Sequence, residues 1–198
     1  MIAIIDYGAG NLRSISRALE SQSGTPVITS DPEEIRSAER VVLPGVGNAK
    51  AAMDQLREQG IDQVVNEVVE AGTPLLGVCL GMQLLLGEQE EGPTDGLGLI
   101  PGSAKLLPVD HKIPHMGWNT VTFRDETPLS DLGSLACYFV HSYAVVPDDA
   151  GDIAATTNYG ITFPSVVIHD HIWGTQFHPE KSGDAGLSLL KAWLDWNP

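Results

Sequence analysis

The chain has 198 residues, of which 42% are hydrophobic, and it carries 11 Lys and Arg against 26 Asp and Glu, a formal net charge of −15 at pH 7. This length and composition are typical of one globular domain with its own core. The negative charge argues against nucleic acid and anionic membranes as binding partners, because both are bound through basic patches.

Cysteine use and hydropathy indicate the compartment. The two cysteines, Cys79 and Cys137, are too few for a disulfide scaffold or a four-cysteine metal site. The first residues lack the basic and long apolar regions of a signal peptide, and no apolar run reaches the ~18 residues of a membrane span. We therefore expect a cytoplasmic protein with no membrane and no nucleic-acid partner.

The first half of the chain alternates short β-rich runs with segments of helical period, which predicts a parallel α/β sheet. Near-continuous apolar runs predict buried strands at residues 2–6, 27–29, 41–43 and 75–78. Apolar residues at helical spacing predict helices at residues 11–24, with Asn11 as N-cap, and at residues 48–59, 61–69 and 80–86.

After Gly92 the pattern changes. Strand-like runs at residues 138–146, 153–157, 165–169 and 172–177 follow one another with only turns between them, so part of the sheet is expected to be antiparallel. A last helix, capped by Asp184, carries Leu187, Leu190 and Leu194. No repeat or linker interrupts the sequence, which predicts a single domain over residues 1–198.

The segment Gly77-Val78-Cys79-Leu80-Gly81 lies at the junction of a buried strand and a helix. It is the cysteine version of the nucleophile elbow, in which a sharp turn holds the nucleophile in a strained conformation. The flanking glycines leave room for the neighbouring elements, and the start of the helix favours a thiolate. A buried structural cysteine is the alternative interpretation.

A cysteine nucleophile that attacks an amide needs a base, and the base needs a group that orients it. His178-Pro179-Glu180 can supply both, because residues two apart on an extended chain face the same side. Pro179 favours that extended geometry at His178. On its own this tripeptide is more typical of an ordinary strand end, and it indicates a catalytic pair only in combination with the cysteine elbow.

Pro44-Gly45-Val46-Gly47 follows the third predicted strand. Its glycines allow the backbone N–H of Val46 to point at an oxyanion, and the N–H of Leu80 would be the second donor. A plain glycine-rich turn is the alternative.

Residues 77–83 (Gly-Val-Cys-Leu-Gly-Met-Gln) together with residues 177–180 (Phe-His-Pro-Glu) resemble the class I, or triad, glutamine amidotransferases. Within that family, residues 6–11, 44–47, 114–119 and 138–143 and Lys181 resemble the glutaminase subunits of imidazole glycerol phosphate synthases. The resemblance extends from residue 2 to about residue 195.

The resemblance implies a flavodoxin-like α/β domain that hydrolyses glutamine to glutamate and ammonia. In this expectation Cys79 is the nucleophile, His178 the base and later the acid, and Glu180 the orienting group. The glutamine would be held by Gly47, Gln83, Glu91, Ser142 and Tyr143.

The resemblance also implies a partner. The ammonia would pass to a (βα)₈-barrel cyclase subunit, in a heterodimer that makes imidazole glycerol phosphate and aminoimidazole carboxamide ribotide in histidine biosynthesis. The expected interface residues are Asn11, Met116, Trp118, Tyr138 and Lys181.

Other motifs are weaker. Gly8-Ala9-Gly10 after the first strand lacks the third glycine of a dinucleotide loop, and His169 with His171 has no further ligand pair at a recognisable spacing. We therefore expect neither metal nor cofactor. The acidic residues Glu88 and Glu90 are read as a solvated helix end, and Cys137 as a core residue. Two alternatives stay open: the glutaminase of another triad amidotransferase, such as pyridoxal phosphate synthase, and a non-catalytic flavodoxin-like subunit.

Overall fold

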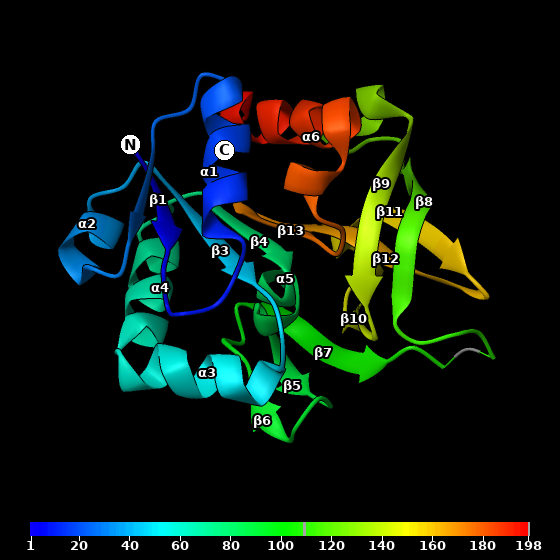
Figure 1. The fold of residues 1–198 in the computed structure, drawn as a ribbon, viewed down its shortest axis with the longest axis horizontal. Coiled ribbons are helices and arrows are strands. Elements are labelled where there is room, and N and C mark those ends of the chain that lie inside the picture. Colours follow the sequence, from blue (N-terminus) through cyan, green and yellow to red (C-terminus); the bar gives the residue numbers. More distant parts are fainter. Residues whose placement is uncertain (109, 198) are drawn as a thin grey trace.

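The computed structural model describes residues 1–108 and 110–197. Its centre is a mixed nine-stranded sheet in the order β2-β1-β3-β4-β13-β12-β11-β8-β9 (Figure 1). The parallel part consists of β1 (Ile2–Ile5), β2 (Pro26–Thr29), β3 (Arg40–Gly45), β4 (Leu75–Cys79) and β13 (Ile172–Thr175). The antiparallel part consists of β12 (Ile161–His169), β11 (Ile153–Tyr159), β8 (His115–Phe123) and β9 (Ser134–His141). The predicted division into a parallel first half and antiparallel later strands is confirmed.

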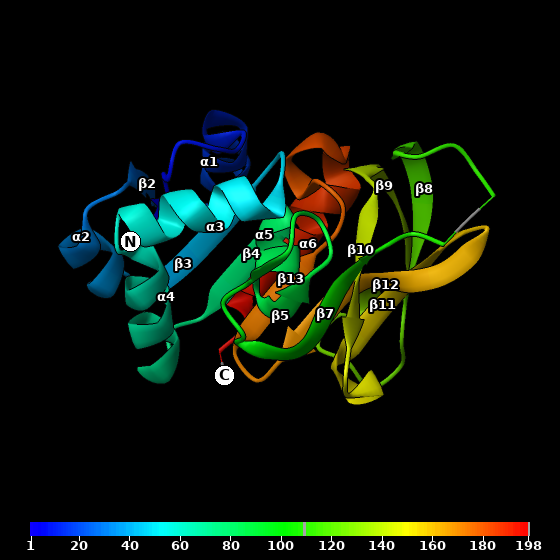
Figure 2. The same cartoon turned by 90° about the horizontal axis from the view of Figure 1, so that it is seen from below.

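Helices cover both faces of the parallel part of the sheet (Figure 2). One face packs against α1 (Leu12–Ser21) and α6 (Gly183–Asp195). The other packs against α2 (Pro32–Arg36), α3 (Ala49–Glu58), α4 (Ile61–Glu70) and α5 (Leu80–Leu84). Short 3₁₀ turns occur at Ser130–Leu132, Ala150–Asp152 and Pro179–Lys181.

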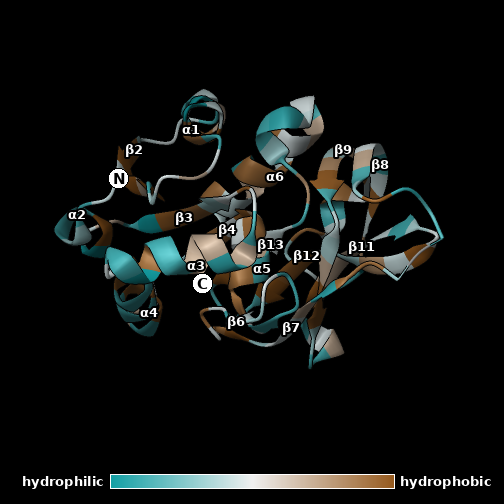
Figure 3. Ribbon diagram, turned by 60° about the horizontal axis from the view of Figure 1, so that its bottom comes forward, coloured by the Kyte–Doolittle hydropathy of each residue, from teal (hydrophilic) through white to brown (hydrophobic). Residues whose placement is uncertain are grey.

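Strand β1 is apolar at every position because both of its faces are buried. Ile2 and Ile4 belong to the core cluster beneath α1 and α6, whereas Ala3 and Ile5 belong to the cluster on the opposite face. Successive side chains of a strand point to opposite faces, so a strand covered on both sides must be apolar at every position. In Figure 3 the strands at the centre of the large sheet are mostly hydrophobic, while α3 carries hydrophilic stretches.

The strand predicted at residues 138–146 is two strands in two sheets. β9 ends at His141, and β10 (Tyr143–Pro147) belongs to a separate four-stranded sheet in the order β10-β7-β5-β6. The other members of this small sheet are β7 (Ile100–Leu106), β5 (Leu86–Gln89) and β6 (Thr94–Asp95). The chain therefore changes sheets at Ser142, because β9 pairs with β8 and β10 pairs with β7.

Three local predictions were wrong. The helix expected to reach Leu86 ends at Leu84, because Leu86 begins β5, and Glu88 therefore lies in a strand and not at a helix end. Ser182, not Asp184, occupies the N-cap position of α6, with Asp184 in its first turn. Asn11 does occupy the N-cap of α1, although its side chain makes no capping hydrogen bond.

The parallel strands place three candidate segments at one edge of the sheet. β3, β4 and β13 are neighbours, and the segments that follow their carboxyl ends carry Val46, Cys79–Leu80 and His178. Ligands of open α/β sheets bind at this edge. Within residues 1–108 and 110–197, the helices are too short or too polar to cross a bilayer.

Candidate active site

Cys79 ends β4 and precedes α5 in a strained backbone conformation, with φ of 56° and ψ of −109°. A positive φ at a non-glycine residue is uncommon and marks functional turns. The flanking glycines are required by close packing: a Cβ at Gly81 would lie 1.9 Å from the carbonyl oxygen of Leu43, and one at Gly77 would lie 2.8 Å from the backbone nitrogen of Met82. The elbow geometry predicted from the sequence is therefore present.

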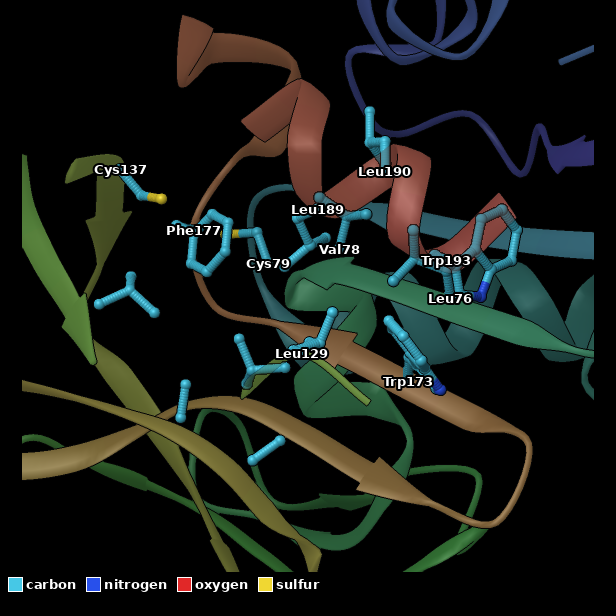
Figure 4. Packing of buried hydrophobic residues seen from close by; sticks show 14 of the residues in the cluster. Leu76, Val78, Cys79, Leu129, Cys137, Trp173, Phe177, Leu189, Leu190 and Trp193 are labelled. Atoms are coloured by element: carbon cyan, nitrogen blue, oxygen red, sulfur yellow. The ribbon is translucent and has the colours of Figure 1, made fainter. Parts of the chain in front are cut away.

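The Cys79 side chain lies at the edge of the core and is 6% exposed. In Figure 4 it stands in the apolar cluster beside Val78, Phe177 and Leu189. Its sulfur lies 3.8 Å from the carbonyl oxygen of Val140, and Nε2 of Gln176 donates toward it at 3.9 Å. The thiol of Cys79 thus lies where the packed core meets a cavity that Cys79 also lines.

His178 and Glu180 form a buried pair. Nδ1 of His178 lies 2.9 Å from Oε1 of Glu180, and the two side chains are 3% and 2% exposed. The expected pairing is present, but the reason given for it was wrong: only His178 is extended, and Pro179–Lys181 form a 3₁₀ turn that brings the carboxylate back to the ring.

The turn that carries this pair is fixed to β9. Ser182 Oγ donates to the carbonyl oxygen of His178 at 2.6 Å and accepts from the backbone N–H of Tyr138 at 2.9 Å. The N–H of His178 donates to the carbonyl oxygen of Tyr138 at 2.9 Å. These bonds fix the backbone of His178, and the contact with Glu180 orients its ring. Nε2 of the ring is buried and has no hydrogen-bond partner among the described residues.

The electrostatics around His178 favour its charged form. Burial lowers the pKa of the imidazole, but the neighbouring Cys79 and the hydrogen-bonded carboxylate of Glu180 outweigh burial and raise the pKa of His178 to about 9. At neutral pH the ring is therefore an imidazolium between a sulfur and a carboxylate. This arrangement can stabilise a thiolate and give a proton to a leaving group.

A cavity of about 230 Å³ opens at this point. Cys79, Leu80 and His178 line it, together with Val46 and all five residues expected to hold glutamine: Gly47, Gln83, Glu91, Ser142 and Tyr143. Three further lining residues, Pro114, Val140 and His141, were not predicted as site residues, although each lies within a segment that carried the resemblance. Their positions depend on how β8 and β9 fold over the cavity, which spacing along the sequence does not encode.

Two glutamine-binding candidates are held by backbone groups. Glu91 Oε2 accepts the N–H of Ala49 at the start of α3, at 3.0 Å. Nε2 of Gln83 donates to the carbonyl oxygen of Tyr143 at 3.0 Å and to Oε1 of Gln176 at 3.1 Å. Gln176, which sequence reasoning did not single out, thus connects Gln83 with the sulfur of Cys79.

The segment expected to supply an oxyanion donor is packed against the elbow. Gly45 pairs with Cys79 in the sheet register, and a Cβ at Gly45 would lie 2.6 Å from the backbone nitrogen of Gly81. The buried hydroxyl of Tyr7 donates to the carbonyl oxygen of Pro44 at 3.0 Å. Val46, in contrast, is 42% exposed, so the buried contacts that anchor this strand end at Gly45.

The residues expected at a partner interface are mostly exposed. Met116 and Trp118 are 62% and 61% exposed on β8, and the Trp118 ring meets that of Tyr138 edge-on at 6.2 Å. Nζ of Lys181 lies 6.0 Å from the centre of the Tyr138 ring. Asn11 lines a small cavity that also contacts His178 and Glu180. These five residues therefore lie close to the candidate site.

The remaining candidates have structural surroundings. Nδ1 of His169 bonds to Asp152, and Nε2 of His171 bonds to the carbonyl oxygen of Val69. In the described part of the chain, no group of three or more His, Cys, Asp or Glu side chains could hold a metal ion. Cys137 is fully buried, as expected, and burial raises the pKa of its thiol to about 12.

The family model described as "Glutamine amidotransferase class-I" matches residues 3–194. The chain belongs to the class I glutamine amidotransferases. It is 50% identical to the imidazole glycerol phosphate synthase subunit HisH of Chloroflexus aurantiacus, over 100% of this chain and 96% of that one. It is 48% identical to subunit HisH 1 of Methanococcus maripaludis, over 98% and 99% of the two chains.

Solved structures agree on the fold of this amidotransferase. A crystal structure titled glutamine amidotransferase matches with a TM-score of 0.76 at 21% identity, over 96% of this chain and 97% of the other. The structure of PurLQS from Thermotoga maritima matches with the same TM-score at 18% identity, over 98% and 97%.

Proposed function

We propose that this chain is the glutaminase subunit of an imidazole glycerol phosphate synthase in histidine biosynthesis, with Cys79, His178 and Glu180 as its catalytic triad. The observation that carries the proposal is the cavity in which a strained cysteine, the histidine of a buried His–Glu pair and the residues expected to bind glutamine meet. High identity along the whole chain to subunits of that name supports the choice of synthase.

The reaction follows from the charge state of the pair. The thiolate of Cys79 attacks the carboxamide carbon of glutamine, and the N–H groups of Val46 and Leu80 donate to the oxyanion. His178 gives its proton to the leaving nitrogen, so ammonia departs and a thioester remains. His178 then takes a proton from water, which attacks the thioester and releases glutamate.

Glu180 holds the proton on Nδ1 of His178 throughout, so that Nε2 is the atom that exchanges protons. Gln83, Glu91, Ser142, Gly47 and Tyr143 hold the substrate. Glu91 supplies negative charge for the α-ammonium group, and backbone groups at Gly47 and Tyr143 bind polar atoms of the glutamine.

The ammonia passes to a (βα)₈-barrel cyclase subunit, and the two chains form a heterodimer in the cytoplasm. The exposed rim of Asn11, Met116, Trp118, Tyr138 and Lys181 would contact this partner. Among them, Met116, Trp118 and Tyr138 supply the apolar and aromatic side chains that are typical of interface centres. Because the chain has a net charge of −15, a basic partner rim would strengthen association, which should then weaken as salt concentration rises.

Glutamate release is measured for this chain alone and with the cyclase subunit and its ribonucleotide. The proposal predicts low activity alone and a marked rise in the complex. The Trp118→Ala variant should weaken association, whereas Val27→Ala, which alters an exposed residue on the distant edge strand β2, should not. No glutamate release under any condition would support the non-catalytic alternative.

A further inference from the structure

Two buried histidines lie beside the cavity and take no part in the proposed chemistry. His115 on β8 and His141 on β9 are directly opposite each other in the sheet, and Nδ1 of His115 lies 2.9 Å from Nε2 of His141. The two residues are 2% and 6% exposed. Burying two polar rings is costly unless each nitrogen has a partner, so the hydrogen bonds of the pair must be accounted for.

A carbonyl oxygen at one end of the pair and an amide nitrogen at the other fix the position of every proton. Nδ1 of His141 lies 2.8 Å from the carbonyl oxygen of Tyr143, which can only accept, so Nδ1 carries the proton and Nε2 accepts. Nδ1 of His115 must therefore donate to Nε2 of His141, and Nε2 of His115 must accept. It accepts from Nδ2 of Asn119 at 3.1 Å.

Asn119 is itself oriented by two contacts. Its Oδ1 accepts the N–H of Thr120 at 2.8 Å, and its Nδ2 donates to the carbonyl oxygen of Asn158 at 2.9 Å. The amide therefore turns its remaining N–H toward His115. The result is a relay, Asn119–His115–His141–Tyr143, in which every donor faces an acceptor and both rings carry their proton on Nδ1.

The surroundings of the relay keep both rings neutral. His115 is stacked between Phe139 and Tyr159, at centroid distances of 4.9 and 4.1 Å, and His141 contacts Phe163 at 5.1 Å. Burial lowers the pKa of each ring to about 4, and the nearby His178 adds to the effect at His141. A proton added to either ring would also make two N–H groups face each other.

The relay ends at the carbonyl oxygen of Tyr143, which has two hydrogen-bond donors, Nδ1 of His141 and Nε2 of Gln83. The second hydrogen of that amide goes to Oε1 of Gln176. Both N–H groups of the Gln83 amide therefore have acceptors. The atom of this amide that can bind a substrate in the cavity is its oxygen, a hydrogen-bond acceptor.

We propose that His115 and His141 are positioning residues for glutamine. Through the relay they fix the carbonyl group of Tyr143, next to the point where the chain passes from one sheet to the other. The fixed carbonyl in turn holds Gln83 so that its amide oxygen can accept hydrogen bonds from N–H groups of the substrate. This inference deepens the proposed function and rests on it. It also explains why a polar pair is kept in an aromatic core, where apolar side chains would pack without hydrogen bonds.

The first test is the tautomer of each ring in the assembled synthase, read by ¹⁵N NMR of histidine-labelled protein. The proposal predicts that His115 and His141 both carry their proton on Nδ1 at pH 7. In a neutral imidazole either ring nitrogen can carry the proton, so finding it on Nδ1 in both rings is specific to the relay. A proton on Nε2 of either ring would overturn the proposal without any variant being made.

The second test is the affinity of the same complex for glutamine in a Cys79→Ser background, which separates binding from turnover. His141→Ala should raise the Kd about tenfold, the size of one lost hydrogen bond. His141→Asn should restore most of the affinity, because its amide nitrogen can donate to the Tyr143 carbonyl. His171→Ala is the matched control: it removes a histidine–carbonyl bond distant from the cavity and should leave the Kd unchanged.

The positioning role and the proposed function can be disproved separately. If His141→Ala leaves the Kd at the control value while the wild-type complex releases glutamate, the positioning role is wrong and the proposed function stands. If the wild-type complex releases no glutamate, the proposed function is wrong whatever the tautomers are.

Discussion

Nδ1 of His178 lies 2.9 Å from Oε1 of Glu180 across a single 3₁₀ turn, and both side chains are almost completely buried. The turn places the carboxylate on the side of the ring away from Nε2, which leaves that atom available to the cavity. In the proposed mechanism this geometry separates two tasks: His178 moves protons, and Glu180 sets which nitrogen does so.

His178→Ala should therefore abolish glutaminase turnover, whereas Glu180→Gln should keep a measurable fraction. Losing the base removes every proton transfer, while an amide oxygen can still accept from Nδ1 and partly orient the ring. Steady-state kcat of the two variants checks this, with circular dichroism confirming that both are folded. Equal and complete loss in two folded variants would contradict the division of roles.

The raised pKa of His178 has consequences for both activity and stability. The ring has a pKa of about 9 in the folded protein and ~6.5 when unfolded, so its contribution to stability is complete below pH 6.5 and is lost as the pH rises toward 9. kcat/KM for glutamine should fall as the pH passes 9, because the imidazolium is the acid that protonates the leaving nitrogen so that it departs as ammonia.

Glu180→Gln offers a check on the cause of this shift. Removing the carboxylate charge should lower the pKa of His178, so the descending limb of kcat/KM should move to lower pH. A limb that stays at the wild-type position would show that another group is titrating.

Gly81→Ala should disrupt the elbow. The added methyl group would lie 1.9 Å from the carbonyl oxygen of Leu43, and neither backbone segment can move without shifting β3 or α5. We expect the free energy of unfolding to fall by about 2 kcal/mol or more, the usual cost of overpacking, with loss of turnover. Gly87→Ala is the control, since its nearest contact would be 3.4 Å. Equal urea midpoints would contradict the prediction.

Val46→Pro tests the oxyanion strand. The substitution removes the N–H proposed to face the oxyanion, and loss of one such donor costs roughly 3–4 kcal/mol in the transition state. A loss of this size should lower the partner-stimulated kcat by two to three powers of ten, while the affinity for glutamine changes little. Single-turnover kinetics measure the first effect, and equilibrium binding measures the second. Full stimulated activity would assign the donor to another group.

The sequence was sufficient for those features that are encoded locally. Cys79 with its two glycines, and His178 with Glu180, are close in the chain, and their residue types and spacing indicated the elbow and the pair, although not the 3₁₀ turn that makes the pair. The five residues expected to bind glutamine came from the family resemblance, and all five line the cavity.

What could not be predicted depends on contacts between remote segments. The split of residues 138–146 at Ser142 arises because β9 and β10 pair with β8 and β7, strands that had not been recognised in the sequence. The relay of His115 and His141 requires the register of two strands, and Gln176 reaches Cys79 only in the folded sheet. No periodicity along the chain carries this information.

Cys79 is proposed as the nucleophile that attacks glutamine, and the chain contains its own control for testing this role. Cys137 is fully buried, and its thiol has a pKa of about 12, so it should stay unreactive while Cys79 reacts. We would treat the assembled synthase with a glutamine-mimicking electrophile and map the adduct by mass spectrometry. The account predicts one adduct per chain, on Cys79, with activity lost in parallel and glutamine slowing the labelling. Labelling of Cys137 alone, or loss of activity without an adduct on Cys79, would contradict it.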